Sequence, residues 1–282
     1  MGPGVVAFST TRLAGCSRGQ YASFNINRYC GDDDSHIARN LELLCRLLAV
    51  TGDHIVMPHQ THGTRVACID AEFLSLRQPE RLAALEGVDA VMTRLPGVCI
   101  GVSTADCIPL LLYDRRRQVA CAVHAGWRGT VSRIAEKAVA AMRRTFGSQP
   151  SDITAHIGPG ISLDSFEVGQ EVYDAFESAG FNMSAISRRY PEADAPRLTK
   201  WHIDLPECNR LQLVASGINP GSISLSGICT YKNHDTFFSA RRLGISSGRI
   251  FNAILLTAEG PQRQGVSFAI ANCRKGNGVQ IS

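Results

Sequence analysis

Three short motifs in this chain carry side chains that bind metals or act as nucleophiles. The motifs QTHG, ADC and HAGWRG contain His62, Cys107 and His124. Two imidazoles and one thiolate form the ligand set of a zinc site that keeps its fourth position open. Water or a substrate can occupy that position, so such a zinc can take part in chemistry. The sequence therefore predicts an enzyme in which these three residues are both metal ligands and catalytic groups.

Each of the three residues taken alone also fits a structural role. A histidine in the polar loop around His62 can simply face water, His124 can be a hydrogen-bonded core residue, and Cys107 can pack as a small hydrophobe. Their joint occurrence in glycine-flanked segments at predicted strand ends makes the functional interpretation as strong as the structural one, because strand-end loops commonly carry sites.

A predicted β-hairpin brings two of the candidates together. Residues 110–113 and 119–124 are apolar runs separated by a polar turn. If Arg115 and Arg116 are the two turn residues, continuing the register places Cys107 directly opposite His124. Opposed side chains share a face with their Cβ atoms about 4.5–5.5 Å apart. Pro109 could end this pairing early, and a slip of one residue would put the two side chains on opposite faces.

Three further residues are candidates for holding substrate or phosphate. Arg128 lies in HAGWRGT, which runs from a predicted strand end to a helix start, where backbone N–H groups favour an anion. Arg12 lies in the loop TTRLAG, flanked by hydroxyl side chains. Asp106 precedes the cysteine and fits either a substrate hydroxyl or a capping role. Both arginines equally fit exposed surface positions.

Composition narrows the class of protein. A chain of 282 residues with 44% hydrophobic and 19% charged residues fits one large or two modest globular domains. The net charge of +4, with no dense basic patch, favours a small anionic ligand over nucleic acid. No apolar run reaches the roughly 18–20 residues of a membrane helix. Ten cysteines without a CxxC pair or a signal peptide favour a reducing cytoplasm.

Periodicity predicts irregularly alternating strands and helices. Strands are expected at 5–9, 55–57, 65–69, 89–93, 98–103 and 153–157, and further regular elements at 222–226, 237–238, 250–256 and 266–271. Helices are expected at 35–50, 130–146, 169–178 and 205–216, with weaker helical character at 71–86 and a polar surface loop at 183–199. This order favours a single α+β (mixed α/β) domain over 1–282, with mixed β-sheets flanked by helices.

The ordered motifs resemble a known family over about residues 5 to 257. They are TTRLAGCSRGQYASFNI, QTHGTRV, GVDAVMT, STADCIPLLLYD, VHAGWRGT, IGPGIS…FEVG and CTY…FFSARR…SGR. In this order they resemble the YfiH/YlmD-type laccase-domain family, which is described as multicopper polyphenol oxidases, purine nucleoside phosphorylases and peptidoglycan editing factors. Two features depart from its pattern: Ala14 stands where a glycine is usual, and His234 is an additional histidine.

The resemblance implies a fold, a site and an activity. The fold is that of the CNF/YfiH-like cysteine hydrolases, the metal and catalytic trio matches His62, Cys107 and His124, and the N-terminal arginine matches Arg12. The implied reaction is zinc-dependent phosphorolysis of adenosine, inosine or methylthioadenosine to the free base and ribose 1-phosphate, with adenosine deamination as a side activity. The expected partners are nucleoside and phosphate, with no nucleic acid or membrane, and the protein would be a monomer or homodimer.

Other classes of function remain open at this stage. The hypothesis of a copper polyphenol oxidase has little physical support, because multicopper sites need many histidines and this chain has eight with no His-x-His pair. Copper in place of zinc at the His62–Cys107–His124 site is a separate alternative. A hydrolase with Cys107 as thiolate nucleophile and His124 as base would suit removal of amino acids from peptidoglycan precursors. A non-catalytic metal-dependent scaffold is the last alternative.

Overall fold

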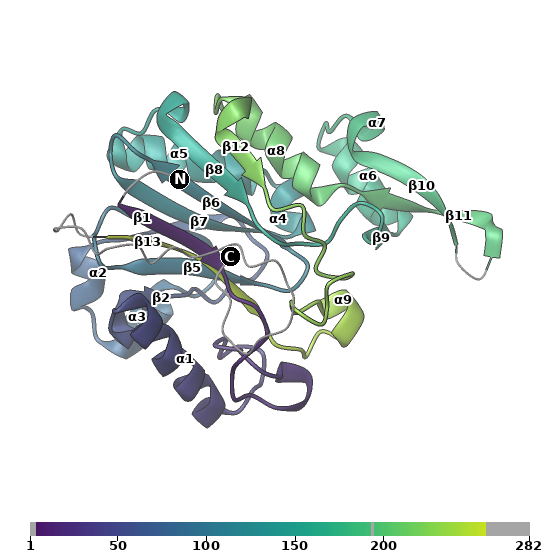
Figure 1. Cartoon of the computed structure of the whole chain (residues 1–282). Helices are drawn as coiled ribbons and strands as arrows, with labels where there is room; N and C mark the ends of the chain where they lie inside the picture. Colours follow the sequence, from purple (N-terminus) through teal and green to yellow (C-terminus); the bar gives the residue numbers. More distant parts are fainter. Residues whose placement is uncertain (1–3, 193–194, 258–282) are drawn as a thin grey trace.

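Two mixed β-sheets packed face to face form the centre of the protein (Figure 1). The computed structural model describes residues 4–192 and 195–257. The smaller sheet has the order β1-β13-β5-β2. Its strands are β1 (Val5–Ser9), β13 (Ile250–Leu256), β5 (Cys99–Thr104) and β2 (Ile55–Val56). Only the β2–β5 pair is parallel.

The larger sheet has six strands in the order β12-β8-β6-β7-β4-β3. They are β12 (Ile223–Leu225), β8 (Ile153–Ile157), β6 (Ile108–Asp114), β7 (Val119–Ala125), β4 (Val88–Thr93) and β3 (Arg65–Ile69). The two edge pairs are parallel and the inner pairs antiparallel. The prediction of mixed sheets in one α/β fold is therefore confirmed.

Alternation along β6 and β7 explains the layering. Leu110 and Leu112 point to the helix-covered side of the larger sheet, while Leu111 and Tyr113 point into the core between the two sheets. Because both faces of these strands are covered, every residue of β6 and β7 is buried and the strands are almost wholly apolar. The ends of these rigid strands provide a fixed platform for side chains.

Helices cover the outer faces of both sheets. On the larger sheet these are α4 (Trp127–Val131), α5 (Ile134–Phe146) and α8 (Leu205–Ala215), which share its core. On the smaller sheet, α1 (Asp34–Leu48) inserts Leu44 against Phe8 and Phe251. Two short helices, α2 (Ala71–Ser75) and α3 (Gln78–Ala84), flank β3 and β4. The short helix α9 (Ala240–Leu243) precedes β13.

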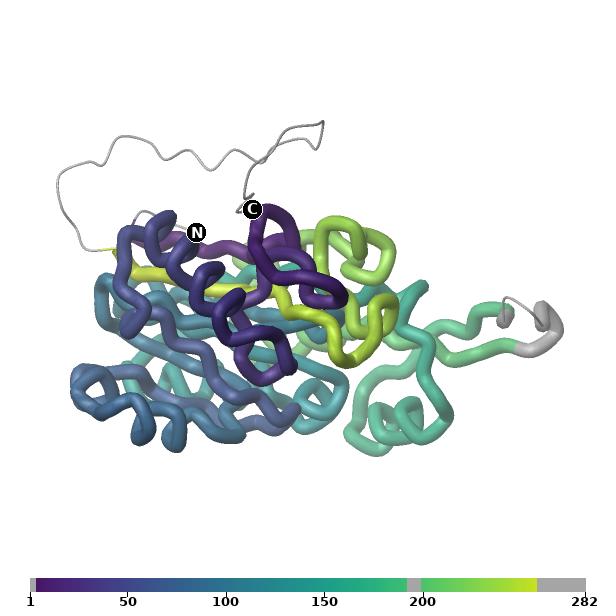
Figure 2. Tube along the Cα trace, turned by 90° about the horizontal axis from the view of Figure 1, so that it is seen from below, coloured from purple at the N-terminus to yellow at the C-terminus, as the bar shows by residue number. Residues whose placement is uncertain are grey.

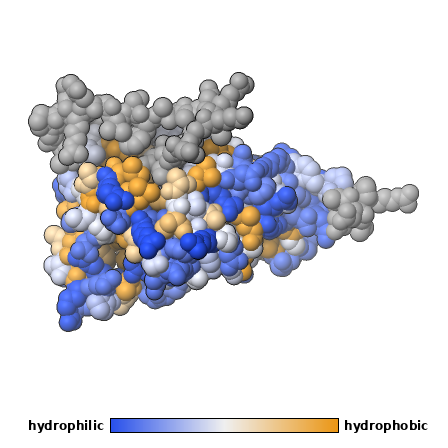
Figure 3. Space-filling view, turned by 60° about the horizontal axis from the view of Figure 1, so that its bottom comes forward, coloured by the Kyte–Doolittle hydropathy of each residue, from blue (hydrophilic) through white to orange (hydrophobic). Residues whose placement is uncertain are grey.

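An arm projects from one end of the sheets (Figures 1 and 2). It consists of β9 (Glu167–Val168), α6 (Gln170–Ser178), α7 (Met183–Ile186), β10 (Ser187–Glu192) and β11 (Ala195–Ile203), whose strands form a separate sheet β10-β11-β9. Its surface is mainly hydrophilic in Figure 3. The predicted loop at 183–199 was wrong, because this polar segment contains α7 and the paired strands β10 and β11, with a register shift between Pro191 and Glu192.

Several other predicted elements need correction. The expected helix 130–146 begins earlier and is broken at Arg133, whose left-handed φ of 63° separates α4 from α5. Phe237 and Phe238, where a regular element was expected, belong to no helix or strand; both rings are buried in a small cluster beside α9. The predicted element at 266–271 lies outside the described residues, and the extent of the single domain over 1–282 stays a prediction.

The hairpin register also differs from the prediction. Four residues, 115–118, form the turn, and Asp114 Oδ1 accepts hydrogen bonds from the backbone N–H groups of Arg116 and Arg117 at 2.9 and 3.0 Å. Consequently His124 lies opposite Pro109 and not Cys107. The register is shifted by two positions, so Cys107 stays on the same face as His124 and becomes its diagonal neighbour.

No helix between residues 4 and 257, the masked pair 193–194 aside, is long and apolar enough to cross a membrane.

Candidate active site

The three residues with metal-binding side chains meet at one end of the two sheets. Cys107 directly precedes β6, His124 lies near the end of β7, and His62 is in the loop between β2 and β3. Their ligand atoms all lie within 4.8 Å of one another. Cys107 Sγ is 3.9 Å from His62 Nε2, and the two imidazole rings are edge to face with centroids 4.8 Å apart. The fold therefore brings together the trio predicted from the sequence.

Asp89, on β4, fixes the positions of two members of the trio. It is fully buried, and its Oδ1 lies 2.8 Å from His124 Nδ1. The same carboxylate accepts hydrogen bonds from the backbone N–H groups of His62 at 3.0 Å and Gly63 at 2.7 Å, with a longer one from Thr61 at 3.3 Å. One aspartate thus orients the ring of His124 and fixes the loop that carries His62, leaving Nε2 of His124 for a ligand.

Two site residues have left-handed backbone conformations. His62 has a φ of 63° and Asp106 has a φ of 88°. Such conformations in non-glycine residues persist when the surroundings hold them and concentrate at functional sites. Here the Asp89 carboxylate holds His62, whereas Asp106 is held through its own side chain: Oδ1 accepts from Thr230 Oγ1 and Oδ2 from the N–H of Arg241, both at 2.7 Å.

Electrostatics favour the ionised thiolate. Burial opposes ionisation of Cys107, but the attraction and hydrogen bonds of His124, and then of His62, outweigh it and lower the pKa of the thiol. Burial likewise disfavours a charged His124, yet Cys107 and Asp89 raise the pKa of this imidazole. Burial alone would raise the pKa of Asp89, whereas its bond to His124 lowers it. The chain thus supplies a thiolate and a carboxylate-supported imidazole at one point.

This donor set fits a tetrahedral metal ion. Zinc bonds of about 2.3 Å to sulfur and about 2.0–2.1 Å to nitrogen separate the two ligand atoms by about 3.6 Å, close to the 3.9 Å between Cys107 and His62. The trio is the single cluster of at least three such ligand residues in the part of the chain that the structure describes. One such cluster suits one ion and offers little for a multicopper centre.

A cavity of about 590 Å³ opens onto the trio. Such a volume suits a small organic molecule. Its lining combines the three ligand residues with aromatic, polar and cationic side chains, including Tyr29, His59, Gln60, Trp127, Phe166, Arg241 and Arg249. The cluster therefore faces a space in which a substrate can bind.

Comparison with known proteins identifies the family. The family model described as "Multi-copper polyphenol oxidoreductase laccase" matches residues 6–257. The chain belongs to this family. A purine nucleoside phosphorylase from Bacteroides thetaiotaomicron is 48% identical over 249 residues, covering 88% of this chain and 90% of that protein. The adenosine deaminase RL5, from an unknown prokaryotic organism, is 47% identical over 251 residues, covering 89% and 94%.

Solved structures agree with this laccase-domain assignment. The crystal structure of the hypothetical protein YfiH from Bacillus licheniformis matches with a TM-score of 0.81 at 29% identity, covering 90% of this chain and 93% of that one. The resemblance to YfiH/YlmD-type proteins is therefore confirmed, and this laccase-domain protein is an enzyme of a family that includes nucleoside-processing members.

The predicted anion-binding residues of this laccase-domain protein do not all lie at the cavity. Arg12 is half-buried, and its guanidinium donates to the carbonyls of Ala22 and His234 at 2.8 Å each and lies over Phe238. Arg128 is exposed and lies over the Trp127 ring, 4.3 Å from its centroid. Neither lines the cavity, whereas Asp106 does. The additional His234 contributes its backbone carbonyl to Arg12, an interaction that any residue at this position can supply.

Three residues of the site were not predicted from the sequence. Asp89 lies in the quoted motif GVDAVMT, where a charge between apolar strand residues was the available signal. Arg241 and Arg249 line the cavity from the C-terminal segment. Arginines in FFSARR and SGR gave no local signal, because only the tertiary fold carries them to the other motifs.

Gly126 is a position where packing around the trio can be tested. A Cβ there would lie 2.9 Å from His62 Cδ2 and 3.0 Å from Cys107 Sγ. We expect Gly126→Ala to displace both ligands and lower metal content at least about tenfold, since ligand distances are held to about 0.2 Å in metal sites. Metal analysis of the purified variant measures this.

Gly52→Ala is the matched control, because a Cβ there meets no atom within 4 Å. A Gly126→Ala protein with the metal content of the Gly52→Ala protein would contradict the described packing.

Proposed function

We propose that this protein is a zinc-dependent purine nucleoside phosphorylase acting on adenosine, inosine and methylthioadenosine, with adenosine deamination as a side activity. The observation that carries the proposal is the opening of the His62–Cys107–His124 trio onto a cavity lined by arginines. The names of the two relatives at 48% and 47% identity support both activities.

His62, Cys107 and His124 would hold the metal, with Asp89 fixing the ring of His124. When bound there, zinc supplies a Lewis acid with a position free for a reactant. In phosphorolysis, a phosphate oxygen forms a bond to the ribose C1′ while the bond from C1′ to the base breaks, and the departing base takes up a proton. The protein must therefore hold an anion beneath the ribose and polar groups near the base.

Arg241 and Arg249 are the cavity-lining cations for that anion. Arg241 donates one Nη1 bond to the carbonyl of Glu167 at 3.0 Å, and Arg249 donates to the carbonyls of Ile245, Ser247 and Gly248. Backbone carbonyls position both side chains without neutralising their charge, so the positive charge remains for an anion. Arg12 and Arg128 stay candidates only if they reorient on binding, since their guanidinium groups lie elsewhere.

The discriminating experiment incubates the purified protein with adenosine, with and without phosphate, and separates the products by chromatography. Adenine that forms only with phosphate, together with ribose 1-phosphate, supports phosphorolysis. Inosine that forms without phosphate supports deamination. Removal of the metal by a chelator should abolish both, and zinc should restore them. Product formation unaffected by exhaustive metal removal would contradict zinc dependence.

The arginine assignment can be tested separately. We expect Arg241→Ala to raise the KM for phosphate about tenfold or more, because a hydrogen bond to a charged group contributes about 1.5–3 kcal/mol, with a smaller effect on the KM for adenosine. Steady-state kinetics at varied phosphate measures this. Arg242→Ala is the control: Arg242 is also exposed on α9 but lies over Tyr231, away from the cavity lining. Equal phosphate KM values in the two variants would exclude Arg241.

A second candidate is supported by the lowered pKa of Cys107 beside His124. Without metal this pair resembles a thiolate–imidazole nucleophile suited to an amide, as in hydrolysis of wrongly built peptidoglycan precursors. Release of an amino acid from a muramyl precursor by metal-free protein would favour this activity.

The nine free cysteines among the described residues support a reducing cytoplasm as the place of action.

A further inference from the structure

A stacked pair of rings lies in the wall of the active-site cavity. Tyr29 and His59 stack with centroids 4.1 Å apart and ring planes 18° apart, and both residues line the cavity. Tyr29 is 36% exposed, so the pair keeps ring surface available. We propose that Tyr29 and His59 form the platform on which the purine ring stacks. This inference rests on the proposed function and names the part of the cavity that would hold the base.

The platform is held rigidly against the rest of the site. His59 Nδ1 lies 2.8 and 2.9 Å from the two carboxylate oxygens of Glu86. The backbone of His59 bonds on both sides, donating to the carbonyl of Leu85 at 3.1 Å and accepting from the N–H of Gly87 at 2.9 Å. A fixed ring loses little freedom when a ligand stacks on it.

A polar network ties the two halves of the platform together. The Tyr29 N–H donates to Asn27 Oδ1, and Asn27 Nδ2 donates to Ser103 Oγ, both at 2.6 Å. Gln60, next to His59, bonds the backbone N–H and carbonyl of Ser103 at 2.8 Å each. Because Gln60 and His62 belong to one loop, the network fixes the platform relative to the metal-binding trio.

The other aromatic groups of the cavity are less suited to stacking a base. Arg128 lies over the Trp127 ring and Arg241 lies 5.6 Å from the centroid of Phe166. Those ring faces are engaged by guanidinium groups, and Arg241 is the candidate for phosphate. Among the described residues no guanidinium group lies over Tyr29, so the Tyr29–His59 pair is better suited to stack a base.

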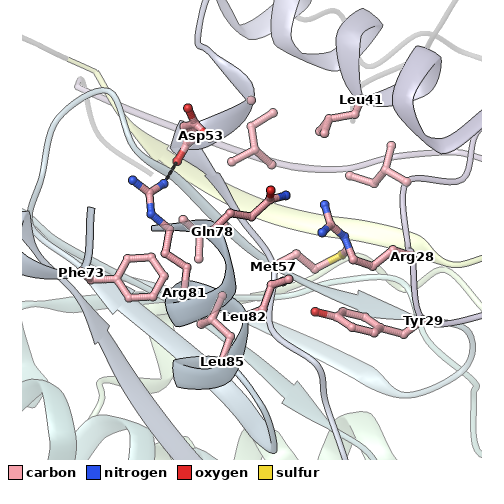
Figure 4. A pocket seen from close by; sticks show the side chains of 14 residues that line it. Arg28, Tyr29, Leu41, Asp53, Met57, Phe73, Gln78, Arg81, Leu82 and Leu85 are labelled. Atoms are coloured by element: carbon pink, nitrogen blue, oxygen red, sulfur yellow. Dashed lines mark hydrogen bonds between the residues drawn. The ribbon is translucent and has the colours of Figure 1, made fainter. Parts of the chain in front are cut away.

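A neighbouring smaller cavity does not compete for the base. It measures about 110 Å³ and is lined by Tyr29 together with Met57, Phe73 and Leu82 (Figure 4). Ligand pockets usually measure at least about 300 Å³. Tyr29 borders both spaces, and only the larger one also contains His62, Cys107 and His124.

The test compares Tyr29→Leu with Tyr29→Phe. Stacking of a base on an aromatic ring is sequence-tolerant and substantial, so Tyr29→Leu should raise the KM for adenosine and the Kd for free adenine about tenfold each, with the KM for phosphate unchanged. Tyr29→Phe keeps the ring and should stay within about twofold of wild type. Tyr173→Leu, which removes a matched stack on Trp201 with centroids 4.1 Å apart on the arm, should leave all three constants unchanged.

The outcomes separate this inference from the proposed function. If the wild-type protein forms neither adenine nor inosine and does not bind adenine, both fail. If it is active and Tyr29→Leu has the adenine Kd of wild type, only the platform is excluded. A general loss of structure in Tyr29→Leu, seen as a lowered melting temperature, is controlled by His59→Gln, which removes the second ring and should weaken adenine binding in the same way.

Discussion

Cys107→Ala is expected to lose the metal and nearly all nucleoside turnover. The substitution removes the only sulfur among three ligand atoms that lie within 4.8 Å of one another, leaving two imidazoles that hold zinc poorly. We expect the rate of adenine or inosine formation to fall at least about a thousandfold, equivalent to about 4 kcal/mol. Metal content per chain and turnover, measured on the same preparation, check both parts.

The fold itself should tolerate this change. Cys107 is only partly buried, so its truncation should cost about 1 kcal/mol of unfolding free energy, as for an average substitution. Cys68→Ala is the control: Cys68 is another half-buried thiol, on β3, and it does not line the active-site cavity. Full metal content and activity in Cys107→Ala would remove this residue from the site.

Asp89→Ala is expected to damage both the stability of the protein and its metal affinity. The substitution leaves the partly buried N–H groups of His62 and Gly63, and the buried Nδ1 of His124, without their acceptor. An unsatisfied buried donor costs about 1–3 kcal/mol, and loss of one partner of a buried ion pair costs about 3–5 kcal/mol. We therefore expect the unfolding free energy to fall by about 3–5 kcal/mol, measured by urea denaturation.

The metal affinity should fall separately from stability. Groups that orient a metal-binding histidine typically contribute 10–100-fold to affinity, and Asp89→Asn, which keeps the shape and loses the charge, should show a loss in this range by competition with a chromophoric chelator. Asp114→Asn is the control, because Asp114 is equally buried and supports the hairpin turn far from the trio. A Zn²⁺ affinity of Asp89→Asn equal to that of Asp114→Asn would show that Asp89 acts on the fold alone.

Features of the site that depend on residues close together in the sequence could be predicted, whereas features that depend on residues far apart in the sequence could not. Local hydrophobic patterns predicted β6 and β7, and these strands bring Cys107 near His124 although the predicted register was off by two positions. The error arose in the turn, where Asp114 stabilises a four-residue connection that a two-residue count misses. A register shift of two residues keeps each side chain on the same face of the sheet. Cys107 and His124 therefore share a face, as predicted.

Longer-range features could not be derived from local patterns. The position of His62 beside Cys107 and His124 depends on Asp89, which fixes the His62 loop. The parallel pairing of β3 and β4 brings Asp89 to this loop. The places of Arg241 and Arg249 in the cavity depend on the packing of the C-terminal segment, and the burial of the Arg12 guanidinium against two carbonyls depends on the carbonyl of His234. The polar composition around Arg188 and Arg189 gave no strand signal, although β10 and β11 pair there.

Zinc K-edge X-ray absorption of the zinc-loaded protein tests the central claim most directly. A metal held by His62, Cys107 and His124 should show one sulfur at about 2.3 Å and two imidazole nitrogens at about 2.0–2.1 Å, with a lighter atom completing four-fold coordination. The sulfur contribution should vanish in Cys107→Ala. A zinc spectrum without sulfur, or one with sulfur that persists in Cys107→Ala, would contradict the account.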